Sequence, residues 1–307
     1  VPHIYNRPMP RPSMIPVFVR EWLGPRAFPR EPEPALVMDD TEQTLAYDHA
    51  GRIDGVMAAA YLFHTAHISQ VIGGRKRILD IACGPAIQLR QVAELNRAAR
   101  FIGIDLSAEM LARARTNLAN GNCDNVEVRH DDMTRLASID DASVDAVIST
   151  MALHHLPSFE HLRQCFSQIA RVLMPGGALY LVDFGRLKSL RSVLYFAYQN
   201  ASHQPHLFSL DYERSLRAAF LPDDFRRALD EFLPGRANVI TTYKVPFLVL
   251  MKSEGQALLP ELPKKLRELR RALPSRYRRD LDDLRLFFRL GGLTPDPFGH
   301  ADSARPG

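Results

Sequence analysis

Two carboxylates flank a short turn of small residues, and this arrangement is the part of the sequence best suited to chemistry. The apolar run 77–81 contains Asp80 and leads into the turn, and the later apolar run 101–105 ends on Asp105. A strand, a tight turn, a helix and a second strand ending in an acid form the front half of a nucleotide-type site. The turn itself consists of Ala82, Cys83, Gly84, Pro85 and Ala86.

The composition of this turn argues against a bound pyrophosphate. Dinucleotide sites use a glycine-rich turn whose backbone N–H groups approach the phosphates. Here the turn has the single glycine Gly84, Pro85 has no N–H to donate, and the charge of Asp80 would repel a phosphate. Asp105 can accept hydrogen bonds from both hydroxyls of a ribose. The predicted ligand is therefore a nucleoside that carries a cationic amino group.

Further segments follow in a fixed order along the chain. The acids Asp131 and Asp132 precede Met133 after the strand-like run 126–129, and the run 144–150 ends on Thr150 before a histidine pair. With the turn and the fifth-strand pattern at 173–183, this order resembles the class I S-adenosylmethionine (AdoMet)-dependent methyltransferase family. The resemblance covers roughly residues 75–185 and, more loosely, 238–252. Ala82 and Ala86 depart from it, because the family often has glycine at these positions.

The resemblance implies a cofactor site and its residues. Asp80 would bind the ammonium group of AdoMet, Asp105 the ribose, and Asp132 with Met133 the adenine, although Asp131 could replace Asp132. Tyr47 would cover the methionine end. The whole expected cofactor-binding set is Tyr47, Asp80, Ala82, Cys83, Gly84, Asp105, Leu106, Asp132, Met133 and Thr150.

The histidines of the chain suggest catalysis in one place and metal binding in two others. His154 and His155 lie where many members of the resembled family line the methyl-transfer site, and a histidine can remove a proton from an acceptor. The alternative is that one packs on the sheet and the other lines the pocket. The pairs His64/His67 and His203/His206 have ligand-like spacing, but no cysteine pair supports them. We therefore expect no metal.

The resemblance and the alternation of elements together predict an α/β fold. We expect a Rossmann-like, seven-stranded, mostly parallel sheet with helices on both faces, a helical insert after strand 5 and a helical C-terminal extension. The insert, at about 186–235, lies where the family places substrate-covering elements. Its polar and aromatic residues are candidates for acceptor binding: Tyr195, Tyr198, Asn200, His203, His206 and Tyr212.

Four parts are expected along the 307 residues. Residues 1–40 form an arm rich in proline and arginine, which is either extended and wrapped on the core through Ile15, Val17, Phe18 and Trp22, or a floppy tail. Residues 41–252 form the methyltransferase domain, 253–290 the helical extension and 291–307 a disordered tail.

Composition narrows the remaining possibilities. No apolar run approaches the roughly 20 residues that span a bilayer, and no basic-then-apolar leader is visible. The three cysteines are scattered and odd in number, which is typical of reduced thiols, so we expect a cytoplasmic protein. The net charge of +4 is modest, and the basic residues of 264–279 alternate with acids. A solvated helix face explains them better than a nucleic-acid or membrane surface.

The expected function is AdoMet-dependent transfer of a methyl group to an O, N or C atom of a small-molecule metabolite. An RNA or protein methyltransferase is a first alternative. The nucleic-acid form is disfavoured because no Asn/Asp-Pro-Pro-aromatic signature follows the run 144–150 and no Pro-Cys nucleophile is present. A catalytically silent binding protein that keeps the fold is a second. A dinucleotide-binding oxidoreductase is a third, which Asp80 and Pro85 disfavour. The sequence leaves the acceptor and the oligomeric state open.

Overall fold

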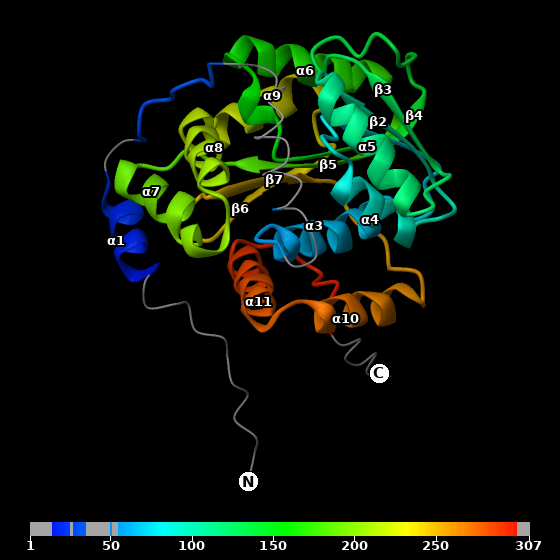
Figure 1. The fold of residues 1–307 in the computed structure, drawn as a ribbon. Helices are drawn as coiled ribbons and strands as arrows, with labels where there is room; N and C mark the ends of the chain where they lie inside the picture. The colour runs from blue at the N-terminus through cyan, green and yellow to red at the C-terminus, as the bar shows by residue number, and fades with distance from the viewer. Residues whose placement is uncertain (1–13, 25–26, 35–49, 51–54, 300–307) are drawn as a thin grey trace, which may run out of the picture.

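A seven-stranded sheet organises the molecule in the computed structural model, which describes residues 14–24, 27–34, 50 and 55–299. The strand order is β3-β2-β1-β4-β5-β7-β6, and only the pairings of β7 with β5 and β6 are antiparallel. This confirms the expected Rossmann-like, mostly parallel sheet (Figure 1). The strands are β1 (Arg77–Ile81), β2 (Arg100–Asp105), β3 (Val126–His130), β4 (Val144–Thr150), β5 (Leu173–Phe184), β6 (Asn238–Thr241) and β7 (Leu248–Lys252).

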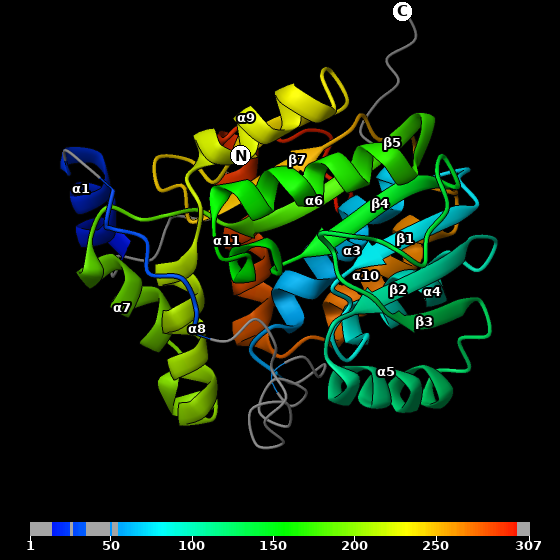
Figure 2. The same cartoon turned by 90° about the horizontal axis from the view of Figure 1, so that it is seen from above.

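Helices cover both faces of the sheet because successive strand residues point to opposite faces. In β1, Ile78 packs in the cluster with α3 (Ala58–Val71), α4 (Ile87–Leu95) and α5 (Ala108–Asn120). Leu79 and Ile81 instead pack with α6 (Phe159–Val172) and α9 (Pro222–Phe232). Figure 2 shows α6 and α9 on one side of the sheet and α3 on the other. A strand that is buried on both faces reads as a continuous apolar run.

The segment after β5 is helical, as predicted. It contains α7 (Leu190–Tyr198), the short 3-10 turn η3 (Ala201–His203), α8 (His206–Ala218) and α9. Helices α7 and α8 project beyond the end of the sheet, where α1 (Ile15–Leu23) lies beside α7 (Figure 2). The insert therefore extends the molecule past the carboxyl ends of the central strands.

The N-terminal arm differs from the extended conformation that its prolines suggested. Residues 15–23 form α1, and Pro16 is compatible with this helix because it lies in the first turn, where a proline costs no backbone hydrogen bond. Val17 is fully buried, which agrees with the predicted contact, but Ile15 and Trp22 are 60% and 69% exposed. The arm thus packs on the core through one face of a short helix.

The C-terminal residues form α10 (Leu262–Ala272) and α11 (Ser275–Leu290), in agreement with the predicted helical extension. The ring of Phe288 on α11 stacks on Phe63 of α3 at 5.2 Å between centroids. Residues 291–299, which we expected in the disordered tail, pack on the same side: Leu293 is buried and Asp296 pairs with Arg285 at 2.7 Å. In the described ranges, no helix combines the length and apolar character that crossing a membrane requires.

Candidate functional site

The turn between β1 and α4 has an unusual backbone. Ala82, Gly84 and Ala86 all have positive φ angles, of 56°, 53° and 57°. Non-glycine residues rarely adopt this left-handed conformation, which costs roughly 1–2 kcal/mol for each. The two alanines thus occupy positions where glycine would be unstrained. A Cβ added at Gly84 would meet no atom within 4 Å, so the turn borders open space.

Asp105 holds this turn from the end of β2. Its Oδ2 accepts a hydrogen bond from the backbone N–H of Gly84 at 2.8 Å, and its Oδ1 accepts one from the N–H of Ser107 at 2.8 Å. Burial raises the pKa of Asp105, and its backbone donors oppose that rise. The pKa of Asp80 is also raised, first by burial and then by the charge of Asp105. A buried acid and a half-buried acid that face one cavity favour a cationic ligand.

Asp131 and Asp132 differ in how much of each carboxylate remains open. Asp131 accepts four hydrogen bonds from its own loop, including the hydroxyl of Ser138 at 2.6 Å. Asp132 accepts from Thr134 through Oδ1, and its Oδ2 makes no hydrogen bond to the described part of the chain. Both acids line the cavity described next, and Asp132 has the carboxylate oxygen that makes no hydrogen bond to the described residues.

These residues line one cavity of about 370 Å³. It lies at the carboxyl ends of β1, β2 and β4, where open α/β sheets bind ligands. His155 also lines it, whereas Tyr47 lies outside the described residues. The expected cofactor residues that line the cavity are Asp80, Ala82, Cys83, Gly84, Asp105, Leu106, Asp132, Met133 and Thr150.

His154 lies behind this cavity on the 3-10 turn η2 (Leu153–His155). Its Nδ1 is 2.7 Å from Oδ1 of Asp183, and its backbone N–H donates to Oδ2 of the same acid. Both side chains are buried. Burial lowers the pKa of His154, but the charge and hydrogen bond of Asp183 outweigh it and raise the pKa overall. Asp183 therefore fixes the ring of His154.

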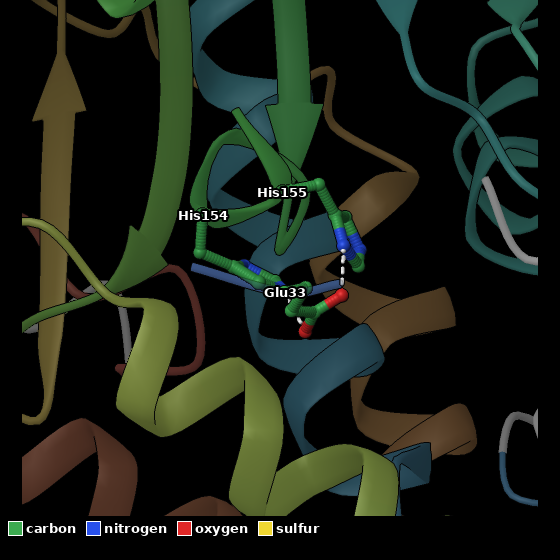
Figure 3. Close-up of side chains that lie close together, drawn as sticks. All are labelled: Glu33, His154 and His155. Atoms are coloured by element: carbon green, nitrogen blue, oxygen red, sulfur yellow. Dashed lines mark hydrogen bonds and ion pairs between the residues drawn. The ribbon is translucent and has the colours of Figure 1, made fainter. Parts of the chain in front are cut away.

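His155 pairs with Glu33, a residue of the N-terminal arm. Its Nδ1 lies 2.6 Å from Oε2 of Glu33, and Oε1 of the same carboxylate accepts from the hydroxyl of Ser215 at 2.9 Å. Burial raises the pKa of Glu33, but the hydrogen bond and charge of His155, with the charge of His154, lower it to about 2. Figure 3 shows the two imidazoles approaching the same carboxylate.

Arg30 anchors the arm in this position. Its guanidinium donates to the backbone oxygens of Ala218 at 2.8 Å, Pro157 at 2.6 Å and Leu156 at 2.5 Å, and stacks over the ring of Phe220. The arm is thereby bonded both to the turn that carries the histidines and to the insert. Sequence reasoning did not single out Arg30, Glu33 or the pairing of Asp183, because nothing local indicates where a proline-rich segment docks.

A second, mostly apolar cavity of about 160 Å³ lies beside the first, and Met151 lines both. Of the expected acceptor residues, Asn200 and Tyr212 line it. Tyr198 instead donates to Glu213 at 2.9 Å, Tyr195 packs edge-on against Phe196, and His203 and His206 are exposed. The rest of the wall includes the aromatic residues Phe18, Phe184, Phe196, Phe208, Tyr243, Phe247 and Phe287.

The other ligand-spaced histidine pair has a core role. His64 and His67 are buried on α3, and burial lowers the pKa of each to about 3. Nδ1 of His64 is 2.7 Å from the hydroxyl of Tyr180.

Comparisons with known proteins agree with the expected class of protein. A family model described as "Methyltransferase domain" matches residues 78–177. An uncharacterized methyltransferase of Mycobacterium tuberculosis is 32% identical over 111 residues, which is 36% of this chain and 52% of that protein. The 27-O-demethylrifamycin SV methyltransferase of Amycolatopsis mediterranei is 36% identical over 112 residues, 35% of this chain and 38% of the relative. The chain thus spans about half or less of the length of these relatives.

One solved structure extends the agreement to the whole fold. The plantazolicin methyltransferase in complex with SAH (S-adenosylhomocysteine, AdoHcy) has a TM-score of 0.52 at 16% identity, covering 86% of this chain and 94% of that one. The strand order, the turn and the matched domain together define a Rossmann-like protein of the AdoMet-binding type. The family match and the strand order show that the chain contains a class I, Rossmann-like methyltransferase domain, matched over residues 78–177.

Proposed function

We propose that this chain transfers a methyl group from AdoMet to an O, N or C atom of a small molecule by in-line displacement. The observation that carries the proposal is the convergence of Asp80, Asp105 and Asp132 on one cavity that shares Met151 with an apolar cavity. AdoMet supplies the activated methyl group. The residues have to align an acceptor with that methyl group and exclude water, and such positioning can contribute several kcal/mol to lowering the barrier.

Each cofactor-binding residue has a proposed role in this scheme. Asp80 binds the ammonium group of the methionine end, and the backbone at 82–84 allows close approach. Asp105 accepts the ribose hydroxyls while it holds Gly84, and Asp132 with Met133 binds the adenine. Leu106 and Thr150 complete the wall, and Tyr47 is proposed to cover the methionine end.

The apolar cavity is the proposed acceptor site. Its aromatic wall suits a flat or largely apolar molecule, and Asn200 and Tyr212 supply polar groups that orient it. Two relatives are named for the acceptors demethylrifamycin SV and demethylmenaquinone, and these names support a small-molecule acceptor. In this proposal, residues 41–252 form the catalytic domain, and the arm and the C-terminal helices are additions to it.

Calorimetric titration tests the cofactor assignment. We expect AdoHcy to bind one site per chain and NAD to show no heat, whereas binding of NAD alone would favour the oxidoreductase alternative. Incubating cell extract with isotopically labelled AdoMet and the protein tests the activity. Label in a small-molecule fraction is the expected result. Label in RNA or protein would redirect the substrate class, and AdoHcy binding without any labelled product would indicate a silent binding protein.

A further inference from the structure

Glu33, His154 and His155 form a cluster that neither the methyltransferase fold nor the proposed cofactor site requires. One ligand atom from each residue lies within 4.8 Å of the other two. Nε2 of His154 is buried, has no hydrogen-bond partner in the described residues, and lies 3.9 Å from Oε1 of Glu33. A buried polar atom without a partner costs free energy, so we expect this nitrogen to bind a group that the chain itself does not supply. We propose that Glu33, His154 and His155 bind a divalent transition-metal ion, with Zn²⁺ as the expected occupant.

The residues behind the cluster are arranged as in protein metal sites. A ligating histidine usually donates its second ring N–H to a carboxylate, which fixes the tautomer and directs the other nitrogen to the metal. Asp183 has this position, since its Oδ1 is 2.7 Å from Nδ1 of His154. Ligating carboxylates are themselves hydrogen-bonded, and Ser215 donates to Glu33 at 2.9 Å. Two of the three ligands thus have the outer partners that a metal site needs.

The third ligand requires one rearrangement. Nδ1 of His155 shares a hydrogen bond of 2.6 Å with Oε2 of Glu33. An ion bound by both atoms replaces this hydrogen bond, and the imidazole proton moves from Nδ1 to Nε2. A ring that carries protons on both nitrogens instead releases the Nδ1 proton to solvent, because only a nitrogen without a proton can bind the ion. Separations between ligands in metal sites exceed 2.6 Å, so the two side chains move slightly apart.

Charge and ligand type select the class of ion. The carboxylates of Glu33 and Asp183 favour a cation, and the guanidinium of Arg30 opposes it, but Arg30 is directed to backbone oxygens and to the ring of Phe220. Two imidazoles and one carboxylate suit zinc and the neighbouring transition metals. Magnesium and calcium prefer all-oxygen sites, so this set selects against them.

Three protein ligands leave an open coordination position, which is the pattern of catalytic rather than structural zinc. His155 also lines the cavity that contains the three acids. An acceptor hydroxyl that extends into the acid-lined cavity and binds at the open position would lose its proton to solvent near neutral pH, since zinc lowers the pKa of a bound oxygen. This consequence rests on the proposed methyl transfer, whereas the metal site itself does not.

The test measures metal binding directly. The full chain is freed of metal with a chelator and titrated with ZnCl₂ by calorimetry, and then with CoCl₂ while its visible absorption is recorded. We expect one ion per chain and a Co²⁺ spectrum of a low-coordinate nitrogen–oxygen site. Glu33→Gln and His155→Gln should each weaken Zn²⁺ binding by about 100-fold or more, because even outer-shell changes cost roughly 10–100-fold.

Glu31→Gln is the matched control. Glu31 is two residues away on the same arm, is exposed, and pairs with Arg217 at 2.9 Å. This variant should bind Zn²⁺ as the unaltered protein does. The AdoHcy affinity and melting temperature of every variant are measured in parallel, so that loss of metal binding is separated from unfolding and from failure of the cofactor site.

Two results would overturn the metal site. The first is no Zn²⁺ binding by the folded, AdoHcy-binding protein, which would leave a metal-free pair between Glu33 and His155. The second is equal Zn²⁺ affinity in the Glu33→Gln, Glu31→Gln and unaltered proteins, which would place the ion elsewhere. Zn²⁺ binding that depends on Glu33 in a protein that does not bind AdoHcy would support the metal site and contradict the proposed function.

Discussion

The two cavities that meet at Met151 are built from very different lengths of chain. The acidic cavity is lined by residues between Tyr61 and Gln164, whereas the apolar cavity draws its wall from Met14 to Phe287. The first depends on one turn and on strand ends that are adjacent in a parallel sheet. The second exists only when the arm, the insert and α11 have packed together. A site of the first kind can be recognised from sequence motifs. The lining of a site of the second kind depends on which segments a chain adds to the central sheet and on how they pack.

The largest effect is expected for the arm, whose residues Met14 and Phe18 line the apolar cavity. Arg30→Ala removes hydrogen bonds to several backbone oxygens and leaves those oxygens without their charged donor. We expect the free energy of unfolding, measured with urea, to fall by about 2–4 kcal/mol. The control is Arg214→Ala, which removes an exposed pair with Asp211 and should change stability by about 0.5 kcal/mol or less. Equal effects of the two variants would mean that the arm does not stabilise the acceptor side.

Asp105 tests the acidic cavity. Asp105→Ala removes the proposed ribose acceptor and also frees the N–H groups of Gly84 and Ser107. The expected loss in AdoHcy affinity is about 1.5–3 kcal/mol, or roughly 10–150-fold, measured by calorimetry.

Asp145→Ala provides a closely matched control for that loss. Asp145 also accepts hydrogen bonds from two backbone N–H groups, those of Lys76 and Arg77 at 2.9 Å, but it lies at the amino ends of β1 and β4. The control should lose stability and keep its AdoHcy affinity. If both variants bind AdoHcy equally, Asp105 is not a cofactor ligand.

Asp80 should show opposite effects on binding and on stability. Its pKa in the folded protein is raised by burial and by Asp105, so ionised Asp80 destabilises the ligand-free fold as the pH rises above the ordinary value of 3.8. Asp80→Asn should therefore increase the free energy of unfolding at pH 7, with a gain that shrinks toward pH 4. The same variant should weaken AdoHcy binding about tenfold, through loss of a charge-assisted hydrogen bond. A fall in both quantities would contradict this assignment.

The smallest expected effect concerns the acceptor. Asn200→Ala and Tyr212→Phe each remove one polar group from the apolar cavity, at a cost of about 1 kcal/mol, or roughly fivefold in the rate of labelled product formation at low acceptor concentration. His203→Ala and His206→Ala change exposed residues of the same insert and should leave that rate unaltered. The reverse pattern would move the acceptor site out of the apolar cavity.

Much of the fold and of the acidic cavity was determined by the sequence alone. Apolar runs that end at a turn or an acid identified β1, β2 and β4, because strands buried on both faces need such runs. Parallel strands place their carboxyl ends at one edge, so Asp80, Asp105 and Asp132 had to converge there. The fixed order of these segments also made the family recognisable.

Only the tertiary structure decided the rest. It folded residues 15–23 into a helix, brought Glu33 to His155, paired His154 with Asp183 and enclosed the apolar cavity. It also made Asn200 and Tyr212, rather than their histidine neighbours, part of that wall. Glu33 and His155 are separated by 122 residues. Local sequence patterns do not predict such a pairing, because the contacts that stabilise it form only after the separate elements have packed together.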